Sequence, residues 1–272
     1  MNKDSVSLAP SVSIPLLGLG TWELRGKACE NTVRMALEIG YRHIDTAHLY
    51  ENHNEVRRAM EGFSREKLFI TSKFFALPPF DSCVEDACNK ALKELATDYL
   101  DLFLLHYPDR KTPMGSILKD LDNLKKSGKV RAIGVSNFTV RHLEEMRKLG
   151  LHAAANQVEF HPYLFQKELL EYCNKHKTRL IAFRSLGKGA LTSDPIVKAI
   201  AEKHGKSIPQ VLLRWATQKN IPVIPKTTSK KHLEENFAIF DFQLDDEDTK
   251  TLDSLEFQHR FCQTKWSDFD YT

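Results

Sequence analysis

The stretch that decides the fold is Leu100-Asp101-Leu102-Phe103-Leu104-Leu105-His106, a nearly continuous apolar run that ends on a polar residue. A strand with one face in water alternates apolar and polar residues, whereas a strand covered on both faces is apolar almost throughout. Strands of the second kind are typical of parallel sheets, in which crossover helices cover both faces. The run therefore predicts a buried parallel strand with a histidine at its carboxyl end.

Similar short runs recur along the chain and alternate with amphipathic helical segments. The candidate strands are Leu16–Gly20, Arg42–Asp45, Leu68–Ser72, Leu100–Leu105, Val130–Val135, Ala154–Val158, Arg179–Phe183 and Val223–Ile224. Eight strand–helix units in 272 residues favour a closed (β/α)8 barrel of the TIM type over an open doubly wound sheet. We expect an α/β protein in which residues 1–272 form one domain, because no linker or low-complexity run divides them.

Residues that begin and end helices frame the helical segments. Asp194 before Pro195 is a typical helix start, and Gly205 is a typical helix end, so they predict a helix over Ile196–His204. Comparable patterns predict helices over Asn31–Ile39, Met114–Lys126 and Lys230–Phe240. Outside the repeat, we expect an N-terminal hairpin over Val6–Ile14, an extra helix over Ile208–Lys219, and a helix with an irregular tail over Asp245–Thr272.

Composition narrows the function classes. The formal net charge is only +3, and Lys and Arg are interleaved with Asp and Glu, so we expect no nucleic-acid partner and no membrane-surface partner. The five cysteines have no C-x-x-C spacing, and their odd number argues against a disulfide framework. The N-terminus lacks the pattern of a secretory signal. We therefore expect a cytoplasmic monomer with reduced thiols that acts on a small molecule.

The reactive groups of such barrels lie at the carboxyl ends of the strands. Several polar or aromatic residues follow the candidate strands directly. They are Thr21 and Trp22; Asp45; Lys73; His106; Ser136 and Asn137; Gln157 and Glu159; Phe183 and Arg184; and Lys226 and Thr227. Asp45, Lys73 and His106 follow three successive strands, and Tyr50 lies shortly after Asp45.

These four residues can protonate a carbonyl oxygen. A tyrosine hydroxyl titrates near pH ~10, but an ammonium beside it lowers the pKa, and a carboxylate keeps that ammonium charged and in place. Tyr50, Lys73 and Asp45 can form this chain, with Tyr50 as the proton donor and His106 orienting the acceptor oxygen. Each residue alone is more typical of a structural role; the four together favour catalysis. Since no side chain donates hydride, a cofactor must supply it.

A Rossmann-type cofactor site is not expected. Gly18-Leu19-Gly20 and Gly187-Lys188-Gly189 both lack the third glycine of G-x-G-x-x-G. Barrels instead bind phosphate groups at their last loops. The stretch Ile224-Pro225-Lys226-Thr227-Thr228-Ser229 offers an ammonium and three hydroxyls ahead of a helix, which suits a phosphate.

Seven motifs together resemble the aldo-keto reductases, of the bacterial type with a short C-terminal tail, from Leu16 to about Leu244. The motifs are Gly18-Leu19-Gly20-Thr21-Trp22, His43-Ile44-Asp45-Thr46-Ala47-His48-Leu49-Tyr50, Ile70-Thr71-Ser72-Lys73, Leu104-Leu105-His106-Tyr107-Pro108, Gly134-Val135-Ser136-Asn137-Phe138, Asn156-Gln157-Val158-Glu159 and Ile224-Pro225-Lys226-Thr227. The resemblance implies NADPH-dependent reduction of aldehydes and ketones by a tetrad of Asp45, Tyr50, Lys73 and His106.

The resemblance also implies a cofactor site. Ser136, Asn137 and Gln157 would bind the nicotinamide carboxamide, and the ring of Phe183 would stack on the nicotinamide. The remaining cofactor candidates are Gly20, Thr21, Trp22, Asp45, Arg184, Ser185, Leu186, Lys188, Lys226, Thr227, Thr228, His232, Glu235 and Asn236. Arg184 replaces the family's usual serine, and either pairs with a cofactor phosphate or faces solvent. His232 replaces an arginine, which predicts NADPH preference with a reduced margin over NADH.

The substrate pocket is implied to be aromatic. Its candidate residues are Trp22, His48, Leu49, Phe75, His106 and Tyr107, with Trp266 of the tail as a candidate lid. Such a pocket suits small aromatic or aliphatic carbonyl compounds. Two alternatives stay open at this point: a barrel that binds the cofactor for regulation or redox sensing with little turnover, and a metal-dependent hydrolase. No cluster of His or Cys residues has metal-ligand spacing, so we expect no metal.

Overall fold

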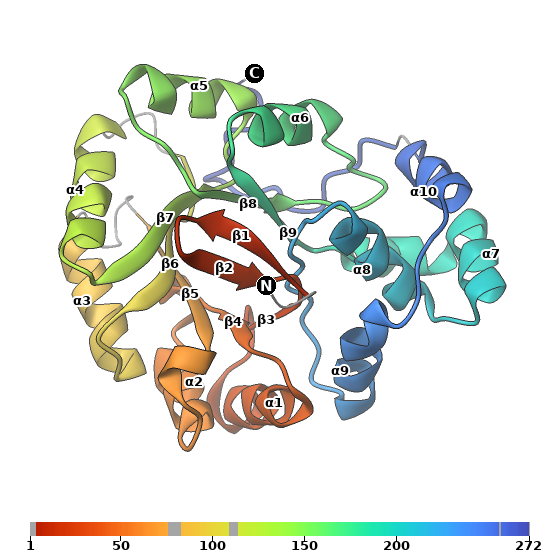
Figure 1. Ribbon diagram of the computed structural model, residues 1–272, viewed down its shortest axis with the longest axis horizontal. Coiled ribbons are helices and arrows are strands. Elements are labelled where there is room, and N and C mark those ends of the chain that lie inside the picture. Colours follow the sequence, from red (N-terminus) through yellow and green to blue (C-terminus); the bar gives the residue numbers. More distant parts are fainter. Residues whose placement is uncertain (1–3, 76–82, 109–113, 256, 272) are drawn as a thin grey trace.

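The computed structural model describes residues 4–75, 83–108, 114–255 and 257–271. Its central feature is a parallel sheet in the strand order β3-β4-β5-β6-β7-β8-β9, curled into a barrel and surrounded by helices (Figure 1). The strands are β3 (Gly18–Gly20), β4 (His43–Asp45), β5 (Phe69–Phe74), β6 (Leu100–Leu105), β7 (Val130–Ser136), β8 (Ala155–Glu159) and β9 (Arg179–Phe183). The predicted barrel is confirmed, and the Leu100–Leu105 strand has its predicted bounds.

The helices lie outside the sheet, as the crossover connections of a parallel sheet require (Figure 1). They are α1 (Gly26–Ile39), α2 (His53–Met60), α3 (Val84–Leu95), α4 (Met114–Lys126), α5 (Val140–Lys148), α6 (Lys167–Lys175), α7 (Pro195–His204), α8 (Ile208–Gln218), α9 (Lys230–Phe237) and α10 (Asp246–Asp253). Short 3-10 helices are η1 (His48–Tyr50), η2 (Arg65–Lys67), η3 (Gly187–Ser193) and η4 (Ala238–Phe240).

Local chemistry explains these helix ends. The carboxylate of Asp194 accepts hydrogen bonds from the backbone N–H groups of Ile196 and Val197, and Gly205 ends α7 in a left-handed conformation. Helix α1 begins five residues earlier than Asn31, and the predicted Lys230–Phe240 helix changes to the 3-10 form after Phe237.

The eighth predicted strand is reduced to a bridge. Val223 alone pairs in parallel with Leu17 on one side and Ala182 on the other. Pro222 and Pro225 flank it, and a proline has no N–H for a strand ladder. Carbonyl groups still close the barrel, because the N–H of Gly18 bonds to the Val223 carbonyl at 2.8 Å and the N–H of Gly20 bonds to the Pro225 carbonyl at 3.1 Å.

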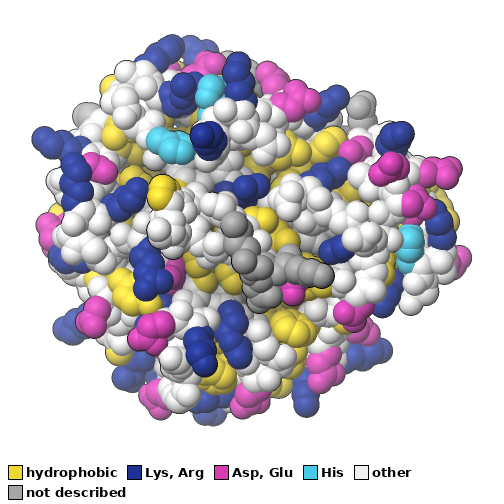
Figure 2. Space-filling model, in the orientation of Figure 1, with side chains coloured by type: hydrophobic (Ala, Val, Ile, Leu, Met, Phe, Trp, Pro, Cys, Tyr) yellow, Lys and Arg dark blue, Asp and Glu magenta, His cyan; other side chains and the backbone are white. Residues whose placement is uncertain are grey.

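The predicted hairpin consists of β1 (Ser5–Ala9) and β2 (Val12–Pro15) and lies across the amino-terminal opening of the barrel (Figure 1). Its side chains Val6, Leu8 and Ile14 pack with strand residues such as Leu102 and Ile181 inside the barrel. Figure 2 shows the hairpin face, on which Lys and Arg side chains alternate with Asp and Glu side chains around the rim. The carboxyl ends of the strands lie at the other end of the barrel, which the hairpin does not cover.

Candidate active site

Three strand ends and one short helix bring the predicted tetrad together. Asp45 is the last residue of β4, Lys73 lies near the end of β5, and His106 directly follows β6. The parallel register pairs Asp45 with Thr71 and places Lys73 beside Leu104, so the three ends lie side by side. Tyr50 ends η1 and is buried. The fold thus assembles residues that are up to 61 positions apart in sequence, from Asp45 to His106.

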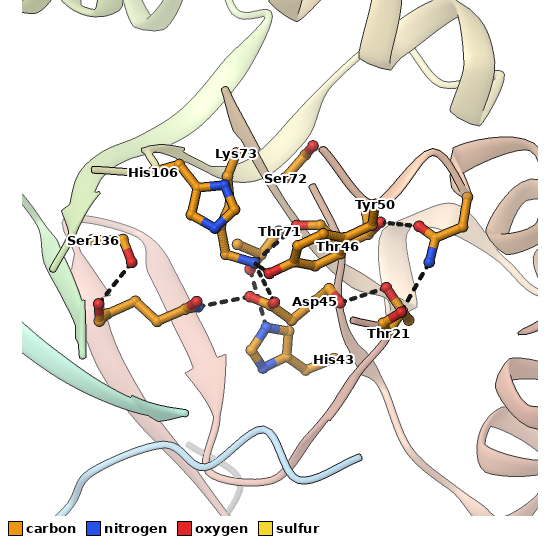
Figure 3. Close-up of polar contacts among 12 residues, drawn as sticks. Thr21, His43, Asp45, Thr46, Tyr50, Thr71, Ser72, Lys73, His106 and Ser136 are labelled. Carbon is orange, nitrogen blue, oxygen red and sulfur yellow. Dashed lines mark hydrogen bonds and ion pairs between the residues drawn. The ribbon is translucent and has the colours of Figure 1, made fainter. Parts of the chain in front are cut away.

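Lys73 is the centre of the hydrogen bonding (Figure 3). Its ammonium donates to the carboxylate of Asp45, to the carbonyl of Thr46 at 3.0 Å and to the hydroxyl of Tyr50 at 3.1 Å. The three N–H groups of an ammonium are therefore all engaged. This chain of carboxylate, ammonium and phenol is the arrangement predicted from the sequence.

The direction of the Tyr50 pKa differs from the sequence prediction. Burial, followed by the negative charge of Asp45, raises the pKa of Tyr50 well above its usual value. The prediction of a lowered pKa is wrong for this state of the protein, because Asp45 neutralises the Lys73 ammonium and the barrel excludes water around the phenol. The hydroxyl therefore keeps its proton at neutral pH, as a proton donor must.

Burial also governs the other three groups. It lowers the pKa of Lys73 and raises the pKa of Asp45, and the contact between the two opposes both shifts. Burial, with the nearby Lys73 charge, holds the pKa of His106 well below its usual value. His106 is therefore a neutral imidazole, and a neutral ring donates a hydrogen bond to an oxygen without bringing a second positive charge into the site.

The predicted carboxamide-binding residues adjoin this group. The side-chain amide of Gln157 donates to Asp45 at 2.7 Å, and the hydroxyl of Ser136 donates to the Gln157 carbonyl at 2.8 Å. The amide nitrogen of Asn137 donates to the His106 carbonyl at 3.0 Å. Its Oδ1 is buried and has no hydrogen-bond partner among the described residues. An unpaired buried amide oxygen is costly, and it suits a ligand that carries an N–H group.

Sequence reasoning missed Asn52, which holds the loop that carries Tyr50. Its amide nitrogen donates to the carbonyls of Thr21 at 2.9 Å and Leu24 at 3.0 Å, and its Oδ1 accepts from the Thr46 hydroxyl at 2.6 Å. Asn52 is fully buried. The signal in the sequence was only an asparagine two residues after Tyr50, and its three partners are scattered, so no local pattern identified it.

A serine–histidine–glutamate chain lies on the other side of β5. His53 hydrogen-bonds to the hydroxyl of Ser72 at 2.9 Å and to Glu94 at 2.8 Å. This is the connectivity of a nucleophilic triad, but Ser72 and His53 are both buried. Figure 3 shows the Ser72 side chain directed away from the Asp45 group. The chain therefore joins β5 to α2 and α3 and presents no nucleophile to a substrate.

Aromatic side chains surround the tetrad. The Trp22 ring meets Tyr50 edge-on at 4.9 Å between centroids, and Phe75 meets His106 at 5.7 Å. Tyr107 stacks on His106 at 5.3 Å. Trp266, from the C-terminal tail, meets Phe75 edge-on at 4.9 Å. His48 and Leu49 are half-buried in η1. Trp22 thus packs against Tyr50, and Phe75, Tyr107 and Trp266 form a connected aromatic group beside His106.

The residues predicted for the phosphate end lie on the loop before α9 and in α9 itself. Lys226 pairs with Glu23 at 3.2 Å, and Ser229 caps α9 by accepting from the N–H of His232. The positive end of a helix with hydroxyl groups beside it is favourable for an anion. Thr228 on the loop is exposed. In α9, Glu235 is half-buried and Asn236 is buried. None of the hydrogen bonds among the described residues connects this group directly to the tetrad.

The residues at the end of β9 and directly after it differ in burial and in hydrogen-bond partners. Phe183 and Leu186 are half-buried, Ser185 is buried with its hydroxyl on the Ala182 carbonyl, and Lys188 is exposed. Arg184 donates from Nη1 to the carbonyl of Phe261 at 3.0 Å, in the C-terminal tail. The sequence left open a cofactor phosphate or solvent for Arg184, and the structure gives it a different partner.

This geometry defines a class of protein, a parallel barrel with a buried aspartate, tyrosine, lysine and histidine at the carboxyl ends of its strands. A family model described as the aldo/keto reductase family matches residues 16–256. The chain is 42% identical over 262 residues to the glyoxal reductase of Bacillus subtilis strain 168, covering 95% of each protein. It is 38% identical to the 9,11-endoperoxide prostaglandin H2 reductase of Trypanosoma cruzi, covering 93% of this chain and 92% of that protein.

Solved structures agree. The crystal structure of an aldo-keto reductase from a Medee basin deep-sea metagenome library has a TM-score of 0.90 and 37% identity, covering 97% of this chain and 98% of the other. The aldose reductase of Schistosoma japonicum has a TM-score of 0.88 and 33% identity, covering 97% of this chain and 95% of the other. The chain belongs to the aldo/keto reductase family. It is an oxidoreductase that acts on carbonyl groups, in a family that uses NAD(P)H.

No group of three or more His, Cys, Asp and Glu side chains in the described part of the chain is arranged to hold a metal ion. Among the same residues, no helix combines the length and the apolar character needed to cross a membrane.

Proposed function

We propose that this protein reduces small aldehydes and ketones to alcohols, with NADPH as the hydride donor and Tyr50 as the proton donor. The observation that carries the proposal is the hydrogen bond from the Lys73 ammonium to the Tyr50 hydroxyl, 3.1 Å long, in a buried group that also contains Asp45 and His106. A phenol that has an ammonium as its neighbour can release its proton to a carbonyl oxygen and remain stabilised as the phenolate.

The four residues divide the work of proton transfer. Tyr50 holds the proton until the carbonyl oxygen gains negative charge. Lys73 then stabilises the phenolate, and Asp45 holds the ammonium in place. His106, as a neutral ring, donates a hydrogen bond that orients the carbonyl oxygen toward Tyr50. The reduced nicotinamide supplies the hydride when it is bound.

The chain has groups that fit the nicotinamide end of such a cofactor. The unpaired Oδ1 of Asn137 can accept a hydrogen bond from a carboxamide N–H, and Ser136 is hydrogen-bonded to both Asn137 and Gln157. Stacking on a nicotinamide needs only a ring, which Phe183 provides without a hydroxyl. Gln157 also contacts Asp45, so cofactor binding and the tetrad share a residue.

At the phosphate end, we expect NADPH to bind more tightly than NADH, by a smaller margin than a guanidinium would provide. Lys226, Thr227 and Thr228 can contact the extra phosphate, but His232 offers a single imidazole ring in place of a bidentate guanidinium. Titration of intrinsic fluorescence with each cofactor gives both dissociation constants. Lys226→Ala should weaken NADPH binding and leave NADH binding unchanged. Tighter binding of NADH to the unaltered protein would contradict the assignment.

The aromatic mouth favours small aromatic and aliphatic carbonyl compounds. Two relatives are named for reducing glyoxal and a prostaglandin endoperoxide, so this scaffold accepts substrates of different sizes. A panel of aldehydes and ketones, assayed through the loss of NADPH absorbance, tests the proposal directly. We expect turnover of several aldehydes. A tight NADPH complex that turns over none of them would indicate the regulatory alternative instead.

A further inference from the structure

The last residue of β8, Glu159, is fully buried at the barrel mouth and has no place in the proposed chemistry. Its two carboxylate oxygens accept hydrogen bonds from backbone N–H groups of the C-terminal tail. The N–H of Phe261 bonds to Oε1 at 2.8 Å, and the N–H of Cys262 bonds to Oε2 at 2.6 Å. One carboxylate therefore holds two successive peptide groups that are about a hundred residues away in sequence.

A third donor keeps this carboxylate charged. The Nε2 of His161 lies 2.9 Å from Oε1, and the ring is also fully buried. Burial by itself raises the pKa of Glu159, but the hydrogen bonds from His161, Phe261 and Cys262 outweigh it and hold the pKa below its usual value. Hydrogen bonds to an ionised acceptor are about twice as strong as those between neutral groups. The attachment is therefore a strong one.

Arg184 holds the same tail residue from the other side. Its Nη1 donates to the carbonyl of Phe261 at 3.0 Å, while Glu159 binds the N–H of Phe261. Arg184 follows β9 with φ at 50°, a left-handed conformation that is uncommon for a residue with a side chain. We call Glu159 and Arg184 the tail clamp. It grips one residue of the tail from two neighbouring strands.

The clamp determines what the tail presents to the pocket. The thiol of Cys262 lies 3.6 Å from the hydroxyl of Tyr107, and Trp266, four residues on, packs against Phe75. Phe75 and Tyr107 both pack against His106. A shift of the tail at Phe261 would therefore move one wall of the space in front of the tetrad.

The far end of the tail is fixed independently. Asp268 contacts His142 at 3.0 Å, and the Thr139 hydroxyl donates to the carbonyl of Tyr271 at 2.5 Å. Trp266 lies between this attachment at α5 and the tail clamp. Loss of the clamp would loosen the near side of the Trp266 wall, where His259 still bonds to the Tyr163 carbonyl at 2.8 Å and Arg260 to Gln166 at 3.1 Å.

We propose that Glu159 and Arg184 are positioning residues that set the preference for aromatic carbonyl substrates by holding the tail wall against the pocket. The proposal rests on the proposed carbonyl reduction at Tyr50. Bulky aromatic substrates contact the Trp266 wall, whereas a small aliphatic aldehyde reaches the tetrad without it. Weakening of the clamp should therefore penalise the aromatic substrate selectively.

The thiol of Cys262 reports on the clamp without any substrate. Cys83 is exposed, so the experiments use a Cys83→Ser background. Cys29, Cys88 and Cys173 are buried, and burial raises the pKa of each thiol to about 12, about 11 and about 12, which keeps them unreactive. The labelling rate of the background protein with an aromatic disulfide reagent then follows the opening of the tail at Cys262.

The first variant is Arg184→Ser, with Arg34→Ser as its matched control. Arg34 also donates to backbone carbonyls, those of Glu61 and Arg58, but it lies far from the tail. Loss of one hydrogen bond should raise the labelling rate of Cys262 about tenfold in Arg184→Ser, and Arg34→Ser should label at the background rate. The KM for 4-nitrobenzaldehyde should also rise about tenfold relative to the KM for propanal.

The second variant, Glu159→Gln, keeps one acceptor oxygen but turns an amide N–H₂ group toward a backbone N–H. We expect faster labelling than in Arg184→Ser and the same change in the KM ratio. If Glu159→Gln does not fold, Arg184→Ser decides alone. Labelling of Cys262 in Arg184→Ser at the same rate as in the Cys83→Ser background protein would overturn the clamp, and a raised Kd for NADPH beside it would not rescue it. Because labelling needs no substrate, it tests the clamp even if carbonyl turnover fails.

Discussion

At the scale of single residues, the tetrad shows what a sequence can and cannot predict. The identities of Asp45, Tyr50, Lys73 and His106 followed from strand ends and motif spacing, because parallel strands bring their carboxyl ends together. The sign of the Tyr50 pKa did not follow, because it depends on how completely the site is desolvated and on the position of Asp45. Burial and pairing are properties of the folded barrel.

A prediction about Lys73 follows from that pKa. Because burial keeps Tyr50 protonated, the proposed role of Lys73 is to stabilise the phenolate that forms as the proton leaves. Lys73→Met should therefore lower kcat for aldehyde reduction by about 100-fold or more, which is in the range of general acid catalysis. The Kd for NADPH, measured by fluorescence titration, should be nearly unchanged. A kcat close to that of the unaltered protein would remove Lys73 from the mechanism.

Glu159 and Asn52 mark the limit of sequence reasoning at this scale. Glu159 was recognised as a polar residue at a strand end, but its partners Phe261 and Cys262 lie in the tail and follow no periodicity. Asn52 likewise joins two carbonyl groups of the loop after β3 to the Thr46 hydroxyl of its own loop. Both residues have partners that only the assembled fold brings into reach.

At the scale of elements, close packing between strands limits the side chains that fit. The barrel was predictable because short strand-like runs alternate with amphipathic helical segments along the chain. The missing eighth ladder was predictable only in hindsight, from Pro222 and Pro225 on either side of Val223. The periodicity of so short a run cannot tell a strand from a single bridge.

Gly134 in β7 gives a prediction at this scale. A Cβ on Gly134 would lie 2.6 Å from the carbonyl oxygen of Ala155 and 2.7 Å from Cδ2 of Leu104. Both contacts are too short, and the first is to a backbone atom that cannot rotate away. Gly134→Ala should therefore lower the free energy of unfolding by about 1–3 kcal/mol in a urea titration.

The matched control is Gly115→Ala in α4. The nearest atom to an added Cβ there is Cδ1 of Leu149 at 3.8 Å, which is an ordinary contact. Alanine also favours the helix, so this variant should be neutral or more stable by up to about 1 kcal/mol. Equal stabilities of the two variants would contradict the packing explanation.

At the scale of the whole molecule, buried neutral histidines couple the fold to pH. Burial, with the nearby Lys73 charge, lowers the pKa of His43 to about 3. The unfolded chain binds a proton there near pH ~6.5, whereas the folded protein does not. The stability contributed by His43 is therefore fully present above that value and decreases as the pH falls toward 3. His106 acts in the same direction.

The corresponding prediction concerns how steeply the free energy of unfolding changes with pH. Between pH 6.5 and 5, the free energy of unfolding should fall with decreasing pH, and each buried neutral histidine adds up to about 1.4 kcal/mol per pH unit. His43→Asn should reduce this slope by up to about 1.4 kcal/mol per pH unit, and the part that comes from His106 should remain. Urea titrations at several pH values measure it, whatever the absolute stability of the variant. An unchanged slope would show that His43 does not titrate as its burial requires.

The central claim, that Tyr50 protonates the carbonyl oxygen, is tested most directly by Tyr50→Phe in a single turnover. The variant keeps the ring that packs against Trp22 and removes only the hydroxyl that Lys73 contacts. The protein is loaded with NADPH, mixed rapidly with 4-nitrobenzaldehyde, and followed through the loss of NADPH absorbance. We predict that NADPH binds with an unchanged Kd and that its oxidation slows by about 10²–10⁴-fold. NADPH oxidation at the rate of the unaltered protein would show that another group supplies the proton.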